Sequence, residues 1–120
     1  MTPEQPITTS VAHRNGVTVV SIGGEIDLST AEVFEAAIAR ALAEEPPVLV
    51  IELSQVQFMA SAGLRILVAT QEKVSKSAQV AVVAGSPATS RPIELTGLDK
   101  VFSLYPTLDD ALIAVRTTAE

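Results

Sequence analysis

The chain contains no cysteine and a single histidine, His13. Without thiols there is no disulfide framework, no thiolate nucleophile and no cysteine-based metal site. One histidine cannot supply the set of ligands that a zinc site needs. We therefore expect His13 to be a solvated residue beside a turn, and we expect neither a metal nor a cofactor.

Aromatic residues are also scarce. They make up 3% of the chain, whereas hydrophobic residues make up 48%. The core must therefore consist of Val, Ile, Leu and Ala, a composition that suits a sheet covered by helices. At 120 residues the chain fits one domain. We predict a single domain over residues 1–120, with a core from about residue 7 to about residue 116.

Positive charge is sparse, with 8 Lys and Arg against 14 Asp and Glu and a net charge of −6. The basic residues are scattered, so the basic patch that nucleic-acid binding requires is missing. No stretch approaches the ~18–20 apolar residues of a membrane span, and residues 1–10 lack the basic and apolar regions of a signal peptide. These absences predict a cytoplasmic protein without direct membrane insertion and without a nucleic-acid partner.

The hydrophobic pattern predicts five strands. They are residues 7–13, 17–22, 48–51, 80–83 and 101–104. Asn15-Gly16 separates the first two β-branched segments, and this dipeptide is a strong signal for an antiparallel hairpin. The third and fourth segments are apolar without polar alternation, which is typical of central strands that are buried on both faces.

Helical spacing predicts four helices. They are residues 30–43, 61–76 and 91–96, and a final helix that opens at Thr107. Ser29 and Glu32 are spaced as a capping box for the first helix. Because Pro92 is tolerated only in a first turn, the third helix should be short, with Ser90 as its cap and Gly97 as its stop. Strand–helix–strand units favour right-handed parallel crossovers, so we predict an α/β fold with a mixed, mostly parallel sheet of about five strands and about four helices.

Ser61 lies where the third predicted strand passes into the second helix. Ligands of open α/β sheets gather at the carboxyl ends of the strands. A phosphate on Ser61 would meet the free N–H groups and the positive dipole end of the helix. Position alone favours a simpler role, because a serine at a helix start commonly caps the first turn.

Four motifs occur along the chain in a specific order. They are Gly-Glu-Ile-Asp at residues 24–27, Leu-Ser-Gln-Val-Gln-Phe-Met-Ala-Ser-Ala-Gly-Leu at 53–64, Leu-Thr-Gly-Leu-Asp-Lys-Val-Phe at 95–102 and Asp-Ala-Leu at 110–112. In residue type, order and spacing this set resembles the STAS-domain anti-sigma factor antagonists of bacteria. The resemblance covers nearly the whole chain and implies a STAS-like single domain.

The resemblance implies a transcription regulator that switches partners. In the family, the middle motif usually reads Asp-Ser-Ser/Thr-Gly-Leu, and a partner that is both anti-sigma factor and serine kinase phosphorylates its first serine, which corresponds to Ser61. The unphosphorylated antagonist binds the kinase and frees a sigma factor. The phosphorylated form releases the kinase, and a serine phosphatase restores it. ATP and magnesium belong to the kinase.

The implied partner-binding surface consists of two segments. Its residues are Asp27, Ser29, Ala60, Ser61, Ala62, Gly63 and Leu64. Asp27 is equally explained as a capping or solvated loop residue, because aspartate favours such positions. Ala60 and Ala62 depart from the family motif, which leaves Ser61 as the only hydroxyl acceptor in it.

A different function is also open, namely a STAS accessory subunit that binds a transporter ATPase without being phosphorylated. The missing acid at Ala60 favours it. An enzymatic function is not expected. Glu25 and Asp27 lie two residues apart, but no His, Lys or second carboxylate pair is placed to complete an acid–base site.

Overall fold

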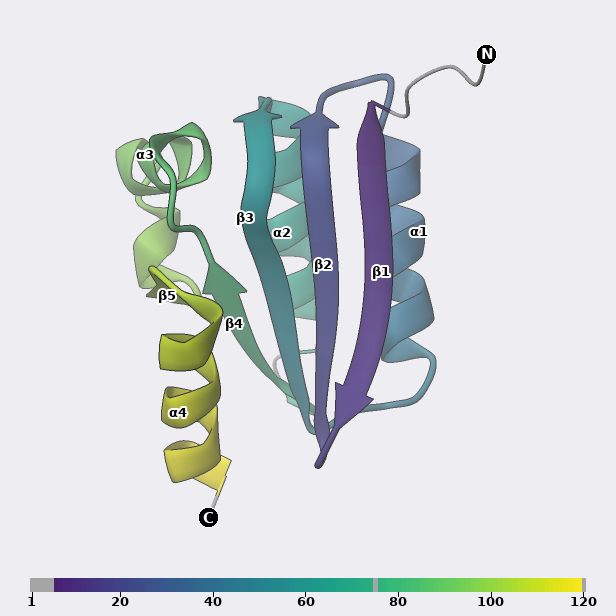
Figure 1. Ribbon diagram of the computed structural model, residues 1–120, viewed down its shortest axis with the longest axis vertical. Helices are drawn as coiled ribbons and strands as arrows, with labels where there is room; N and C mark the ends of the chain where they lie inside the picture. The colour runs from purple at the N-terminus through teal and green to yellow at the C-terminus, as the bar shows by residue number, and fades with distance from the viewer. Residues whose placement is uncertain (1–5, 75, 120) are drawn as a thin grey trace.

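One five-stranded sheet organises the residues described by the computed structural model, which are residues 6–74 and 76–119. Its strands are β1 (Ile7–Arg14), β2 (Val17–Ile26), β3 (Val48–Met59), β4 (Gln79–Val83) and β5 (Ser103–Tyr105). They follow one another across the sheet in chain order, with β1 antiparallel to β2 and the other neighbours parallel (Figure 1). This confirms the predicted α/β fold with a mixed, mostly parallel sheet.

Four α-helices cover the sheet in the described part of the chain. They are α1 (Ala31–Leu42), α2 (Ser61–Val74), α3 (Pro87–Leu95) and α4 (Leu108–Ala119), with a 3₁₀ turn at Leu98–Lys100. Helices α1 and α2 lie behind the sheet in Figure 1, and α4 lies in front of β4 and β5. The domain thus has a helix layer on each face of the sheet.

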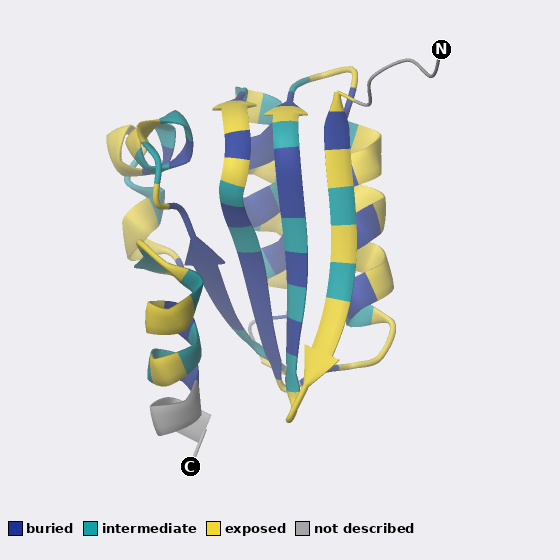
Figure 2. Cartoon of the chain, viewed as in Figure 1, coloured by how far each residue is buried: buried dark blue, intermediate teal, exposed yellow. Residues whose placement is uncertain are grey.

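The core is aliphatic and is divided by the sheet. A large cluster lies between the sheet and helices α1 and α2, and it contains the buried Phe34 and Phe102. A smaller cluster lies under α4, formed by Val48, Val50, Ala81, Val83, Ala111 and Val115. Figure 2 shows β3 and β4 in the dark blue of buried residues over most of their shared length. Burial on both faces explains their uninterrupted apolar sequence.

The β1–β2 connection is the hairpin that Asn15-Gly16 predicts. Arg14 pairs with Val17, which leaves a two-residue loop. Asn15 has φ 51° and Gly16 has φ 81°. Two consecutive positive φ values define the type I′ turn, whose twist matches that of the flanking strands.

β2 and β3 extend well beyond the predicted ends at residues 22 and 51. Their parallel pairing continues to Ile26 opposite Met59, with two register shifts on the way. Gly24, between the shifts, has φ 92°, and a Cβ atom there would lie 2.2 Å from the carbonyl oxygen of Pro6. The irregular pairing disrupts the polar–apolar alternation, which is why the pattern did not predict these strand ends.

The prediction for the third helix is wrong. Helix α3 is not a short helix at residues 91–96 capped by Ser90. It begins at Pro87 with Ser86 at the N-cap position, and Pro92 lies inside it. Gly97, the predicted stop, follows the helix with φ 77°.

Tertiary packing explains why α3 tolerates the internal proline. Pro92 lacks the N–H that would reach the carbonyl of Ala88 four residues earlier, so one helical bond is missing. Thr89 and Ile93, one turn apart, are both fully buried. Their burial beside the upper part of β3, which β4 does not pair, offsets the lost bond.

The chain after α3 is shifted relative to the prediction. β5 covers residues 103–105 in place of 101–104, because the 3₁₀ turn takes up the preceding segment. Helix α4 opens as expected, with the N–H of Asp110 donating to Thr107 Oγ1 at 3.1 Å.

Candidate functional site

Two loops meet where β2 and β3 end side by side, at the upper end of the sheet in Figure 1. One loop follows Ile26 and leads into α1, and the other follows Met59 and leads into α2. The N–H of Ala60 donates to the carbonyl oxygen of Ile26 at 2.8 Å. The structure therefore brings together the two predicted segments around Asp27 and Ser61.

Ser61 is the first residue of α2 and its side chain is exposed. The carbonyl oxygen of Ala60 accepts the N–H of Gly63 at 2.9 Å, so the cap position falls on Ala60. Within the described residues the hydroxyl of Ser61 has no hydrogen-bond partner. The structure shows no side-chain cap at Ser61, and the residue as a whole is exposed.

The other predicted surface residues differ in exposure. Ala60 and Ala62 are half-buried, and Gly63 and Leu64 are buried. A Cβ atom on Gly63 would lie 2.8 Å from Ile26 Cγ2 and 3.2 Å from Met59 Cγ. Gly63 therefore allows α2 to start directly against the ends of β2 and β3, which sets the position of Ser61.

A shallow, mainly apolar groove of about 330 Å³ runs along α2 from Ser61. It is lined by Ser61, Leu64, Arg65, Val68, Ala69, Glu72, Thr96 and Leu98. Its two charged residues, Arg65 and Glu72, have opposite signs. The surface beside Ser61 is therefore nearly neutral.

Asp27 organises the loop between β2 and α1. Its Oδ1 accepts the N–H of Ser29 at 2.9 Å, the hydroxyl of Ser29 at 2.7 Å and the N–H of Thr30 at 3.2 Å. The hydrogen bond from the Ser29 hydroxyl, followed by those from the Ser29 and Thr30 backbone, holds the pKa of Asp27 below its usual value of 3.8. Within the structure, the Asp27 side chain therefore bonds to its own loop.

Thr30 is a site residue that sequence reasoning missed. It is only 2% exposed, and its Oγ1 accepts the N–H of Asp27 at 2.9 Å and donates to the carbonyl oxygen of Glu25 at 2.8 Å. Thr30, not Ser29, occupies the N-cap position of α1. The predicted Ser29 capping box is wrong, because the Ser29 hydroxyl donates back to Asp27.

Two large apolar side chains near the two loops are exposed. Leu28 is 85% exposed in the loop before α1, and Phe58 is 51% exposed near the end of β3. Sequence reasoning did not predict that either residue would be exposed, because large apolar side chains are usually buried.

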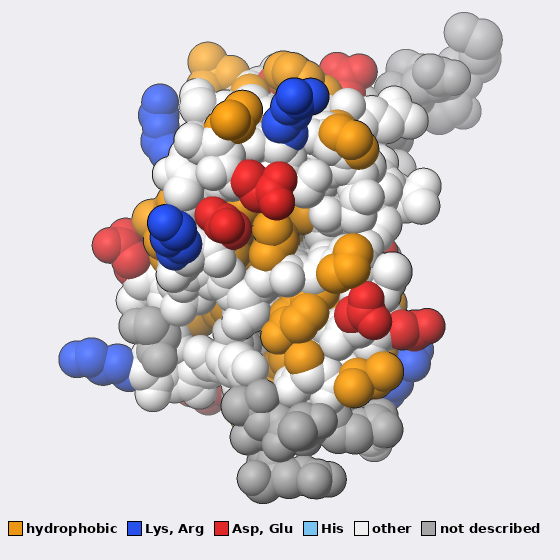
Figure 3. Space-filling view, turned by 90° about the vertical axis from the view of Figure 1, so that its left-hand side faces the viewer, with side chains coloured by type: hydrophobic (Ala, Val, Ile, Leu, Met, Phe, Trp, Pro, Cys, Tyr) orange, Lys and Arg blue, Asp and Glu red, His pale blue; other side chains and the backbone are white. Residues whose placement is uncertain are grey.

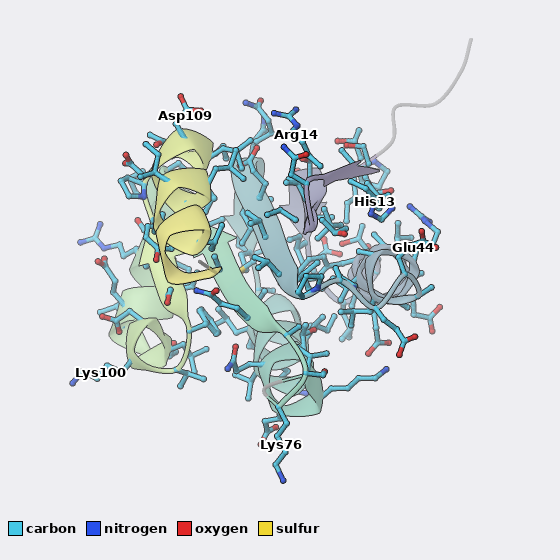
Figure 4. The ribbon with its side chains drawn as sticks, turned by 90° about the horizontal axis from the view of Figure 1, so that it is seen from below. His13, Arg14, Glu44, Lys76, Lys100 and Asp109 are labelled. Carbon is cyan, nitrogen blue, oxygen red and sulfur yellow. The ribbon has the colours of Figure 1, made fainter. Side chains whose placement is uncertain are left out.

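The remaining chemistry-bearing groups form no second site in the residues described. His13 is exposed at the hairpin end, on the same side as Glu44 (Figure 4), and its Nδ1 lies 2.8 Å from Thr18 Oγ1. In the same residues, no group of three or more His, Asp and Glu could hold a metal ion. Blue and red side chains are interspersed on the face in Figure 3, without a basic patch.

None of the helices in the described ranges is long and apolar enough to cross a membrane.

Comparison with known proteins identifies the class. Residues 8–111 match the family model of the STAS domain. The chain belongs to the STAS-domain family of anti-sigma factor antagonists.

Two relatives share more than half of the aligned residues with this chain, and a third shares the fold. The chain is 53% identical over 116 residues to the anti-sigma-F factor antagonist RsfB of Mycobacterium tuberculosis, covering 97% of this chain and 95% of RsfB. A crystal structure of an anti-sigma factor antagonist from Mycobacterium paratuberculosis is 60% identical, with a TM-score of 0.88 over 92% of this chain and 94% of that one. The phosphorylated form of the Bacillus cell fate determinant SpoIIAA has a TM-score of 0.67 at 17% identity, over 90% of this chain and 99% of that one, and shares the fold.

Proposed function

We propose that this chain is an anti-sigma factor antagonist that binds an anti-sigma factor with serine kinase activity and thereby frees a sigma factor. The binding surface is formed by the two loops at the ends of β2 and β3, including Asp27, Ser29 and residues 60–64. Phosphorylation of Ser61 switches it off, and a serine phosphatase restores it. Because the partner sequesters a sigma factor, the exchange takes place in the cytoplasm.

One observation supports the proposed phosphorylation switch at Ser61. Ser61 is exposed and its hydroxyl is unpartnered among the described residues, at the first position of a 14-residue helix. Phosphorylation requires an accessible hydroxyl, and the helix N-terminus stabilises the phosphate dianion that results. The fold of SpoIIAA, for which a phosphorylated form is solved, is compatible with such a group.

The surroundings of Ser61 explain how phosphate would weaken binding. Ala60 and Ala62 flank the hydroxyl, and the adjoining groove is mainly apolar. A phosphate adds about −1.5 to −2 charges. A partner that packs closely on this surface would have to desolvate that charge, and the nearby Asp27 carboxylate adds like charge to the same surface.

A labelling and binding experiment tests the proposal. Purified wild-type chain is mixed with the anti-sigma-F factor of Mycobacterium tuberculosis, the partner named for RsfB, with magnesium and ATP. We expect phosphate on wild type and on Ser103→Ala, which loses a serine hydroxyl at the exposed start of β5, outside the proposed binding surface, and none on Ser61→Ala. We expect Ser61→Asp to bind the anti-sigma factor at least about tenfold more weakly.

Labelling that persists on Ser61→Ala would exclude Ser61 as the acceptor. If neither binding nor labelling occurs while RsfB binds in parallel, the antagonist function is wrong for this partner.

The alternative function, an accessory subunit of a transporter ATPase, is favoured by Ala60, which removes the acid that the family usually places before the acceptor serine. It predicts co-purification with a transporter ATPase and no phosphate on Ser61 in cells.

A further inference from the structure

Leu28 is the most exposed large hydrophobic residue in the described part of the chain, at 85%. Ile26, two residues earlier, is fully buried. An isolated exposed leucine needs no explanation in itself. Leu28 differs because of how firmly its loop is held and where that loop lies.

The loop is fixed by its own hydrogen bonds. Asp27 Oδ1 accepts the N–H groups of Ser29 and Thr30 and the Ser29 hydroxyl, so these hydrogen bonds span Leu28 in the sequence. The buried hydroxyl of Thr30 joins the N–H of Asp27 to the carbonyl oxygen of Glu25. Leu28 is therefore presented outward by an ordered backbone, so binding it would cost little conformational entropy.

The same hydrogen bonds suit Asp27 to ordering its loop more than to contacting a partner directly. Its Oδ1 accepts hydrogen bonds from Ser29 and Thr30 of its own loop. We therefore assign Asp27 as a positioning residue whose carboxylate orders the loop.

The loop that carries Leu28 starts beside the loop that carries Ser61. The residue pair Ile26 and Met59 ends the β2–β3 pairing, and the Ile26 carbonyl oxygen accepts the Ala60 N–H directly after it. A partner that covers Ser61 at the start of α2 therefore also reaches the start of the Leu28 loop. Burying a leucine side chain removes apolar surface from water, which favours binding.

We propose that Leu28 is an apolar anchor that inserts into a hydrophobic pocket of the anti-sigma factor, with Asp27 and Thr30 holding it in place. The proposal rests on the antagonist function and deepens it. The occupant is the anti-sigma factor and not a second copy of this chain.

Isothermal titration with the anti-sigma-F factor of Mycobacterium tuberculosis tests the anchor, with RsfB as positive control. We expect Leu28→Ser to weaken binding at least about tenfold and Leu28→Met to stay within about threefold of wild type. Ile113→Ser is the matched control, because Ile113 is 66% exposed on α4, and it should bind as wild type. Thermal unfolding of Leu28→Ser should match wild type, since the side chain is exposed.

The outcomes separate the anchor from the antagonist function. If wild type binds and Leu28→Ser binds equally well, or Ile113→Ser is weakened as much, the anchor is wrong while the function stands. If light scattering shows that wild type self-associates and Leu28→Ser does not, with partner binding unchanged, the occupant is a second copy and the proposal is overturned. If RsfB binds and wild type does not, the antagonist function itself fails for this partner.

Discussion

The backbone N–H of Ala60 donates a 2.8 Å hydrogen bond to the carbonyl oxygen of Ile26. This bond extends the β2–β3 pairing by one step past Met59 and joins two loops that lie 34 residues apart in sequence, from 26 to 60. One loop presents Leu28 and the other presents Ser61. A partner can therefore contact both loops at once, and a charge added to one loop affects binding to both.

Removing the Ser61 hydroxyl should not change stability. Ser61→Ala deletes a group without a hydrogen-bond partner in the described residues, so we expect a free energy of unfolding within about 0.5 kcal/mol of wild type. Thr107→Ala is the matched control, because Thr107 Oγ1 accepts the Asp110 N–H, and it should cost about 1 kcal/mol. Urea unfolding measures both. An equal loss for the two variants would mean that Ser61 acts as a cap.

A methyl group on Gly63 should destabilise the domain. Gly63→Ala places Cβ 2.8 Å from Ile26 Cγ2, in a fully packed contact. Overpacking of this kind costs about 1–3 kcal/mol, and the better helix propensity of alanine returns at most about 1 kcal/mol. Chemical denaturation should show a net loss. A variant as stable as wild type would show that α2 can move away from β2 without cost.

The hydroxyl of Thr30 should contribute more to the free energy of unfolding than the methyl group of the same side chain. Thr30→Val leaves the Asp27 N–H and the Glu25 carbonyl oxygen without their partner, which should lower the free energy of unfolding by about 1–3 kcal/mol. Thr30→Ser keeps the hydroxyl and should recover most of that loss. The expectation is contradicted if valine is tolerated better than serine, because the buried methyl group would then be the stabilising element.

The ionisation of Asp27 should make a small contribution to stability that is lost at low pH. Its folded-state pKa lies below the usual 3.8, chiefly through the Ser29 hydroxyl. The contribution is therefore present above pH 3.8 and is lost as pH falls through the folded-state pKa. Carboxyl chemical shifts measured by NMR should titrate with a midpoint below 3.8 in wild type and closer to 3.8 in Ser29→Ala. Equal midpoints in the two proteins would mean that Ser29 is not the main cause.

Local patterns were sufficient for much of the fold. Asn15-Gly16 predicts its hairpin because few residues other than Asn and Gly adopt two consecutive positive φ values, here 51° and 81°. The runs at residues 48–51 and 80–83 predict central strands because only burial on both faces favours continuous apolar sequence. Ser61 was found through its motif and its place after a strand, and the structure puts it at a helix start.

Other features depend on contacts between distant segments. Pro92 lies within α3 because Thr89 and Ile93 are buried there, and propensity alone predicted a later start.

The sequence by itself determined the layered α/β architecture and the place of Ser61 at the start of a helix, since both follow from local spacing and residue type. Only the tertiary structure decided that the loop of Asp27 adjoins that of Ser61, that Thr30 secures the Asp27 loop and that Leu28 is left exposed. The physical reason is that register between β2 and β3, with its two shifts, is set by packing across the sheet.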